Sequence, residues 1–283
     1  MTRDTNGRIW SNVRRSFLVP LAALTLSLAA SAQLAEPVKW GSPDQPYGRR
    51  RSVTDADRAA IKAYRSGNKK PVLSTMFSTP SELQEAWDIV QDDNRSGDFL
   101  SCRRAGNVEP TSAGLRLKTM VATDCTNRWS TGYIASKEKY SYGFFEARIK
   151  IADVAGMNNA FWLTTDDNYE VDIAEMRYPN YIHIGLQYWP PKGSQEKHTG
   201  VGWGAKFVEN FSEGFHDIGM LWTPTDMVFE VDGEPVAAAA LHGSVKGPVQ
   251  VRLSTALLGS AGKVPEHPEG HDMVVKSIRI YGQ

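Results

Sequence analysis

Segments in which apolar and polar residues alternate recur along the chain from about residue 72 onward, and two clear ones cover residues 144–151 and 182–189. An alternation with a period of two is typical of a β-strand that buries one face and turns the other away from the core. Asp232 and Gly233 follow a strand-like run and are a strong signal for a β-hairpin turn. No internal repeat indicates a propeller, so the pattern predicts an all-β sandwich of two packed antiparallel sheets.

Two short stretches favour a helix instead. Thr54 is a suitable N-cap for a helix that starts at Asp55, and Gly67 is a suitable stop. A second helix is expected from Pro80 to Val90, because proline fits the first turn of a helix.

The first of these helices lies in a stretch that is rich in proline, glycine and charge, residues 33–71. We interpret this stretch as an N-terminal extension that packs on the main domain, residues 72–283. Its arginine triplet, residues 49–51, is expected to be a solvated surface rather than a binding site.

The N-terminus, residues 1–32, is typical of an export signal. Arginines come first, an apolar run covers residues 17–30, and a small-x-small cleavage site ends at Ala32. The run contains Pro20 and is too short to span a bilayer of about 30 Å, which disfavours the alternative of a membrane anchor. Arg14 and Arg15 resemble a twin-arginine signal, and an ordinary Sec signal fits equally well. Either signal predicts a mature protein that is secreted or periplasmic.

The composition is that of a folded protein without an excess of positive charge. Hydrophobic residues make up 41% of the chain and charged residues 23%, which is too little charge for a disordered protein. Removal of the signal changes the net charge from zero to about −3, which argues against a nucleic-acid partner. We also expect no membrane association after signal removal, and a monomer.

The chain has two cysteines, Cys102 and Cys125. In an exported protein a single disulfide between them is the simplest interpretation, and two separate buried thiols are the alternative. Residues 114–118 resemble a strand that follows a turn, so the cysteines could close a hairpin of neighbouring strands.

Three carboxylates occur within six residues of strand-forming sequence: Glu170, Asp172 and Glu175. Acids gathered on one strand repel one another, so stability alone does not require them. In a regular strand Glu175 would face the core, where an unpaired carboxylate costs several kcal/mol. We therefore predict a β-bulge near Ile173 or Ala174 that returns Glu175 to the acidic face.

The bulge sets the distance between the two glutamates. Their backbones would lie roughly 13 Å apart at ~3.3 Å per residue. If each side chain leans inward by about 4 Å, the carboxylates come within about 5 Å, which suits a retaining glycosidase rather than an inverting one at ~6.5 Å or more. An acidic strand that faces solvent and a calcium site are the alternatives that this segment alone leaves open.

Further motifs surround the acids. The Glu-x-Asp-x-x-Glu segment is accompanied by Tyr-Gly-Phe-Phe-Glu-Ala-Arg at 142–148, Asn-Ala-Phe-Trp-Leu at 159–163, Phe-His at 215–216, Trp-Thr-Pro at 222–224 and Val-Asp-Gly at 231–233. In this order they resemble glycoside hydrolase family 16, over about residues 72–283. The resemblance implies a β-jelly-roll with a concave cleft that hydrolyses β-linked polysaccharide internally, with net retention of anomeric configuration.

By matching position, the resemblance implies that Glu170 is the nucleophile, Glu175 the general acid/base and Asp172 the assisting carboxylate. These roles agree with the chemistry, because one carboxyl must protonate the leaving oxygen while another faces the oxocarbenium-like centre as an anion. The three groups are expected to titrate together.

Sugar binding needs flat apolar surfaces and planar hydrogen-bonding groups. Trp162 matches the family tryptophan that stacks on a sugar beside the scissile bond, and Gln187 departs from a histidine that many relatives carry. Core packing is the alternative for each aromatic residue, and a cross-strand ion pair is the alternative for Glu146 and Arg148. The full set of candidate binding residues is Trp162, Glu146, Arg148, His183, Gln187, Trp189 and Trp129.

The substrate is less well determined. The bulged acidic motif resembles laminarinases and the agarase or carrageenase groups, while the run from Asn158 to Trp162 is closer to the galactanase groups. We expect a β-1,3- or mixed-linkage β-1,3-1,4-glucan, with a red-algal galactan as the alternative. A net charge near −3 disfavours a sulfated substrate unless a local arginine or lysine cluster overrides it.

Two other kinds of activity stay open, a transglycosylase and a non-catalytic glucan-binding lectin. We expect no cofactor and no catalytic metal. A structural calcium ion is not readable from the sequence.

Overall fold

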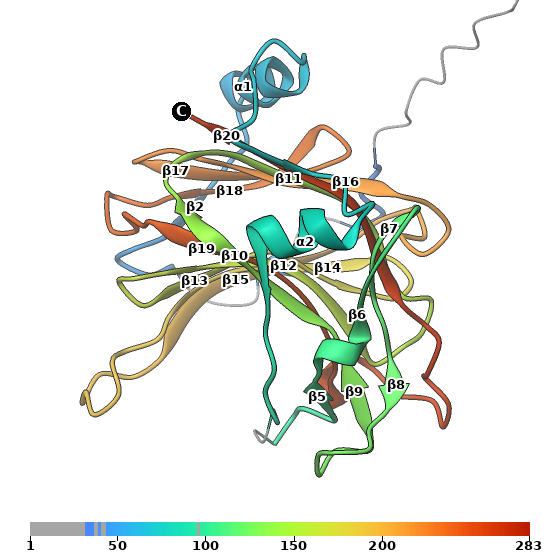
Figure 1. Cartoon of the computed structure of the whole chain (residues 1–283). Helices are drawn as coiled ribbons and strands as arrows, with labels where there is room; N and C mark the ends of the chain where they lie inside the picture. The colour runs from blue at the N-terminus through green and yellow to red at the C-terminus, as the bar shows by residue number, and fades with distance from the viewer. Residues whose placement is uncertain (1–31, 37–38, 41–43, 95–96) are drawn as a thin grey trace, which may run out of the picture.

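Two antiparallel sheets pack face to face in the structure, a computed structural model that describes residues 32–36, 39–40, 44–94 and 97–283 (Figure 1). The first sheet has eight strands, in the order β1 (Lys39–Trp40), β15 (Thr199–Lys206), β14 (Tyr181–Tyr188), β13 (Tyr169–Arg177), β12 (Met157–Thr165), β19 (Val249–Leu257), β10 (Tyr133–Tyr140) and β4 (Trp87–Ile89). The second has nine strands, in the order β2 (Arg49–Arg51), β18 (Glu234–Ala240), β17 (Asp226–Val231), β16 (His216–Trp222), β11 (Gly143–Lys150), β20 (Met273–Gly282), β7 (Gly114–Leu117) and β6 (Val108–Thr111), with β3 (Leu73–Thr75) also on β20. The predicted sandwich of two antiparallel sheets is confirmed.

Smaller elements complete the fold. A third sheet has the order β5 (Ser101–Arg103), β9 (Trp129–Thr131) and β8 (Met120–Val121), and β5 runs parallel to β9. The helices are α1 (Asp55–Arg65), α2 (Pro80–Ala86) and two short 3₁₀ turns, η1 (Ala105–Asn107) and η2 (Gly259–Ala261).

The core lies between the two large sheets, and the alternation in the sequence decides which side chains enter it. On β12, Phe161 and Leu163 are fully buried in this core, whereas Ala160 and Trp162 point to the opposite side of the sheet. The period of two therefore leaves the outward face of the eight-stranded sheet free to carry a binding site.

Helix α1 covers the outward face of the nine-stranded sheet (Figure 1). Thr54 is its N-cap, as predicted, and Asp57 completes a capping box with it. Tyr64 stacks on Phe144 of β11 with ring centroids 5.4 Å apart. Gly67, the predicted stop, has a φ of 78° just beyond the end of the helix. Since β2 pairs with β18, the extension contributes both a strand and a covering helix to this sheet.

The arginine triplet is expected to be a solvated surface rather than a binding site, and one member, Arg51, is partly buried by ion pairs within the protein. Its guanidinium lies 2.7 Å from Asp57 Oδ2 and 2.5 Å from Asp226 Oδ1. Arg51 thus ties the first turn of α1 to the edge of the nine-stranded sheet.

The second predicted helix is shorter than expected, because α2 ends at Ala86. Trp87 is 2% exposed, packs against Phe77 and donates its indole N–H to Thr75 Oγ1. Burial of this large side chain and pairing of β4 with β10 stabilise an extended backbone where helix propensity alone favoured another turn.

Cys102 and Cys125 form a disulfide, with an S–S distance of 2.11 Å, so the predicted pairing is confirmed. The geometry differs from the expected hairpin, because Cys102 lies on β5 and Cys125 lies in the loop between β8 and β9. The strand expected at residues 114–118 is present as β7 and pairs with β6. The disulfide holds β5 in place, and β5 ends at Arg103.

The predicted export signal falls outside the described residues except for Ala32. In the part of the chain that the structure describes, no helix is long and apolar enough to cross a membrane.

Candidate active site

Strand β13 carries the three acids, and it contains the predicted bulge. On one side Phe161 pairs with Ala174 while Trp162 pairs with Asp172, so Ile173 has no partner on β12. The register with β14 shifts over the same residues. The extra residue turns Glu175 onto the same face as Glu170 and Asp172, as expected.

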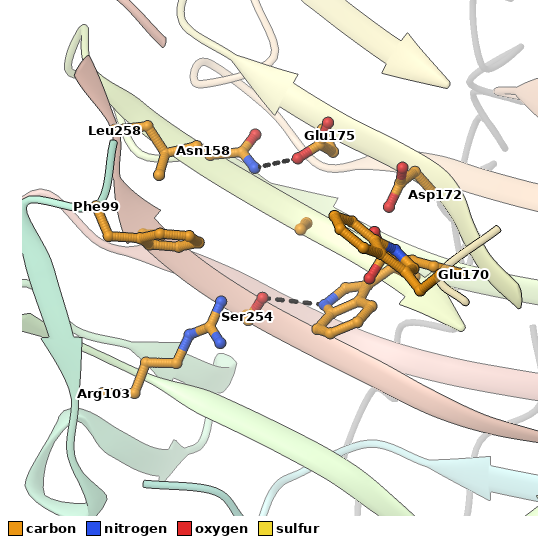
Figure 2. Close-up of a pocket in the computed structure, with 12 residues that line it drawn as sticks. Phe99, Arg103, Asn158, Glu170, Asp172, Glu175, Ser254 and Leu258 are labelled. Carbon is orange, nitrogen blue, oxygen red and sulfur yellow. Dashed lines mark hydrogen bonds between the residues drawn. The ribbon is translucent and has the colours of Figure 1, made fainter. Parts of the chain in front are cut away.

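That face forms the floor of a pocket of about 320 Å³ on the outward side of the eight-stranded sheet. Figure 2 shows the three acids on one side of the pocket, with Phe99, Arg103 and Ser254 on the other. Its lining comes from β12, β13, β19, the segment that contains β5 and residues just outside these strands: Phe99, Arg103, Asn158, Ala160, Trp162, Glu170, Asp172, Glu175, Trp189, Ser254, Ala256 and Leu258.

Glu175 is held by two neighbours. Asn158 Nδ2 donates to its Oε1 at 2.6 Å, and His183 Nδ1 lies 2.8 Å from its Oε2 (Figure 2 shows the first bond). Burial favours the neutral carboxyl, but the hydrogen bonds with His183 and Asn158 outweigh it and lower the pKa of Glu175. In the free protein this carboxyl is therefore held as an anion.

The pKa values of Glu170 and Asp172 are raised, opposite to that of Glu175. Burial raises the pKa of Glu170 to about 7, against a hydrogen bond from Trp189 and with a further contribution from the charge of Glu175. Burial also raises the pKa of Asp172 well above its usual value, and the two glutamates add to this shift. These directions favour a proton on Asp172 or Glu170 over Glu175 in the free protein, whereas the expected roles place it on Glu175.

Two of the predicted binding aromatics line the pocket, Trp162 and Trp189. The indole N–H of Trp162 donates to Ser254 Oγ at 3.0 Å, and its ring stacks on Tyr133. Trp189 is 48% exposed and stacks on His198 with ring centroids 3.9 Å apart. Trp162 is thus a fixed platform, while Trp189 forms an exposed rim.

His183 and Gln187 lie beside the acids, paired with Glu175 and Glu170 on the neighbouring strand β14, and outside the pocket lining. Gln187 makes a hydrogen bond to Asp172, and its Oε1 lies 3.2 Å from His198 Nε2. A Cβ at Gly200 would collide with Gln187 Oε1, so the glycine makes room for this side chain. The two predicted residues therefore orient the carboxylates.

The structure contradicts the cleft assignment of Glu146 and Arg148. Both lie on β11 in the nine-stranded sheet and face outward beneath α1. Glu146 is paired with Arg65 of α1, and Arg148 Nη1 lies 3.0 Å from Asp217 Oδ1 on the neighbouring strand. The alternation in the sequence correctly places Glu146 and Arg148 on one strand face, but it does not indicate which sheet contains that strand.

Trp129 is also absent from the pocket lining. It lies on β9 of the small sheet and is half-buried against a cluster that contains Met157 and Leu257, with Arg128 over its ring. The packing alternative is correct for this residue.

Several pocket residues were missed by sequence reasoning. Asn158 lies two strand positions from Ala160 and four from Trp162, so the alternation that placed Trp162 on the pocket face would have found it. Phe99 and Arg103 carry no such signal, because they reach the pocket from a segment that joins it only in the folded chain.

Among the described residues, two groups bring metal-ligating atoms within 4.8 Å of one another. The first is Cys102, Asp124 and Cys125, whose sulfurs are committed to the disulfide. The second is Asp172, Glu175 and His183, in which His183 is already engaged with Glu175. The absence of a metal or cofactor stays a prediction.

The similarity to known proteins covers the region that contains the pocket. The model of glycosyl hydrolases family 16 matches residues 99–257, more than half of the chain. Endo-1,3-1,4-beta-glycanase EglC of Rhizobium meliloti (strain 1021) is 29% identical over 179 residues, which are 61% of this chain and 37% of that protein. The chain thus spans little more than a third of the length of this curated relative.

A second related sequence and a crystal structure are also similar to this chain. Beta-agarase AgaB34 of Agarivorans albus is 28% identical over 138 residues, covering 41% of this chain and 28% of that protein. The crystal structure of LamAcat from Zobellia galactanivorans superposes with a TM-score of 0.65 at 18% identity, over 77% of this chain and 99% of that one, and so shares the fold.

Proposed function

We propose, from the premise that the chain belongs to the glycosyl hydrolases family 16, that it cleaves β-linked polysaccharide internally with retention of anomeric configuration. The observation that carries the proposal is the bulge in β13, which brings Glu170, Asp172 and Glu175 to one pocket beside Trp162. Two carboxyls on either side of a bound sugar supply a nucleophile and a proton donor.

The proposed reaction is a double displacement. The Glu170 carboxylate attacks the anomeric carbon while Glu175 donates its proton to the leaving oxygen, so the glycosidic bond breaks and a glycosyl-enzyme ester forms. Glu175 then takes a proton from water, which attacks the same carbon and releases Glu170. Each step inverts the anomeric centre, and two inversions give net retention.

The protons must be redistributed before the first step. The reaction needs Glu170 as an anion and a proton on Glu175, and Asp172 lies between them as a third proton-binding group. We infer that entry of the sugar oxygen replaces a donor such as Asn158 at Glu175, which raises the pKa of Glu175. The hydrogen bond from Trp189 favours the charged form of Glu170, so it assists the loss of that proton.

A β-1,3- or β-1,3-1,4-glucan is the proposed substrate, in line with the name of the rhizobial relative. A galactan is the second candidate, because the agarase of Agarivorans albus is also a relative and the run from Asn158 to Trp162 favours that group.

We also propose that the protein works outside the cytoplasm. The Cys102–Cys125 disulfide supports this, because such bonds persist in oxidising compartments. Expression of the full chain in a bacterium, followed by fractionation and mass spectrometry of its N-terminus, should find it outside the cytoplasm and starting near Gln33.

The function is tested by incubating the mature protein with laminarin, lichenan, agarose, porphyran and κ-carrageenan, with Glu170→Gln as the control. Oligosaccharides should appear early and in a range of lengths, and proton NMR should show the β-anomer first. First appearance of the α-anomer would exclude retention. Binding without release would support a lectin, and products longer than the substrate would support a transglycosylase.

A further inference from the structure

Two arginines lie on the side of the pocket away from the acids. Arg103 lines the pocket, and Figure 2 shows its guanidinium turned toward Ser254 and the interior. Arg252, on β19, lies over the Trp162 ring at 5.1 Å, and Trp162 lines the same pocket. The proposed hydrolysis uses neither arginine.

Arg103 is held in an unusually enclosed position. Its side chain is 12% exposed, and its guanidinium lies over the ring of Tyr133 at 4.6 Å. Nη1 forms an ion pair with Asp92 Oδ2 at 3.1 Å, while Nε is buried without a partner among the described residues. A buried donor left unpaired costs free energy, so this guanidinium has hydrogen-bonding capacity to spare.

Arg252 has only neutral partners. Its Nε donates to Thr164 Oγ1 at 2.9 Å, and its Nη2 donates to Gln250 Oε1 at 2.6 Å. No carboxylate in the described ranges lies within ion-pair distance of Arg252. Burial, together with the positive charge of Arg103, lowers the pKa of Arg252.

The charges on this side of the pocket therefore do not balance. Asp92 is the carboxylate that forms an ion pair with Arg103, and the more distant Glu170 acts on Arg103 through its charge alone. Arg252 has no such partner among the described residues, and the positive charge of Arg103 acts against it. A neutral sugar hydroxyl could fill the free donor of Arg103 but would leave Arg252 without an anionic partner. A planar or tetrahedral oxyanion satisfies both, because guanidinium forms paired hydrogen bonds with such groups.

We propose that the part of the pocket between Trp162 and Arg103 binds a sugar with an anionic substituent, either a sulfate ester or a carboxylate. This inference rests on the proposed function and adds that the β-linked polysaccharide, whether glucan or galactan, carries anionic groups. The arginine pair would also allow a mature protein with an expected net charge near −3 to bind such a polymer, because it supplies positive charge locally at the binding site.

The test compares matched neutral and anionic substrates. The neutral polysaccharide that the mature protein cleaves best is used as it is, after partial sulfation, and after oxidation of C6 hydroxymethyl groups to carboxylates. The value of kcat/KM on at least one anionic form should exceed that on the neutral parent by about tenfold or more. This anionic-to-neutral ratio should fall as NaCl is raised from about 50 to 500 mM. The two derivatives separate sulfate from carboxylate recognition.

Single substitutions test which arginine is responsible for the preference for anionic substrates. Arg252→Gln should lower the anionic-to-neutral ratio about tenfold, and Arg252→Lys should recover part of it. Arg128→Gln is the matched control, because Arg128 lies over Trp129 as Arg252 lies over Trp162 but is exposed and outside the pocket. Its ratio should equal that of the wild type. Arg103→Gln, checked for folding by circular dichroism because it leaves Asp92 unpaired, should act like Arg252→Gln.

A wild-type protein that cleaves the parent at least as well as both derivatives would overturn the inference and leave the proposed function standing. So would an Arg252→Gln protein that slows neutral and anionic substrates equally. If no polysaccharide is cleaved, the proposed function fails, and calorimetric binding of the same three preparations decides the inference. A tenfold tighter affinity for an anionic form would then support it, and equal affinities would reject it.

Discussion

The protein carries two groups of three carboxylates, one on the outward face of each sheet, and they differ in what covers them. In the pocket, Glu170, Asp172 and Glu175 have no arginine or lysine within ion-pair distance in the described part of the chain, and only His183 pairs with one of them. On the nine-stranded sheet, Arg65 of α1 pairs with three carboxylates, those of Glu146, Asp217 and Glu230.

The comparison separates acids used for structure from acids kept for chemistry. Arg65 compensates the second group and fastens α1 to the sheet, although Glu230 is so deeply buried that its pKa is still raised to about 8. The pocket group is left without such an ion pair, and burial raises the pKa of two of its members, Glu170 and Asp172. A carboxylate cluster without a built-in cation, facing a pocket, is therefore the stronger sign of catalysis.

The largest effect that distinguishes the two groups is on turnover. Glu170→Gln should lower kcat by about 10⁴-fold or more, because an amide cannot form the glycosyl ester. Glu146→Gln, the matched change on the other sheet, should leave kcat within about twofold. Both are measured by reducing-sugar release at a temperature where circular dichroism shows folded protein. Comparable losses of kcat in the two variants would contradict the distinction between catalytic and structural carboxylates.

The next largest effect is on stability. Arg65→Met should lower the free energy of unfolding by about 3–5 kcal/mol, since it leaves buried carboxylates without their cation. Arg58→Met is the control on the same helix, where Arg58 pairs with Glu234 at the surface and should contribute under about 1 kcal/mol. Urea unfolding of both variants measures the difference. Equal midpoints would show that Arg65 does not fasten the helix.

A smaller effect depends on pH. The pKa of Glu170 is raised to about 7, so between about pH 4.5 and 7 the folded protein binds more protons at this site than the unfolded chain, and stability falls as pH rises. Glu170→Gln should therefore stabilise the protein by about 2 kcal/mol at pH 8 and have little effect at pH 4. Thermal unfolding at the two pH values tests this, and a stabilisation that is the same at both would refute the raised pKa.

The smallest effect concerns the donor at Glu175. Asn158→Ala removes a hydrogen bond that favours the charged carboxyl, so the pKa of Glu175 should rise by up to about one unit. Because the general acid must be protonated, the alkaline limb of the kcat/KM profile should move to higher pH. A profile of unchanged shape with a uniformly lower rate would instead assign Asn158 to substrate binding alone.

The sequence by itself determined the local geometry of this protein. The period of two indicates which residues share a strand face. The cost of burying Glu175 predicts the bulge that the structure contains at Ile173. The N-cap at Thr54 and the Asp232–Gly233 turn, with φ values of 51° and 88°, follow from equally local rules.

Only the tertiary structure decided which sheet each face belongs to and what covers it. Glu146 and Arg148 have the same alternation as a cleft strand, yet β11 joins the nine-stranded sheet, and Arg65, 81 residues away from Glu146, reaches that face from α1. Arg103 enters the pocket from a segment that shares no strand pattern with β13. Alternation reports the orientation of side chains along one strand, whereas sheet order and pocket walls arise from contacts between distant segments, which no local period encodes.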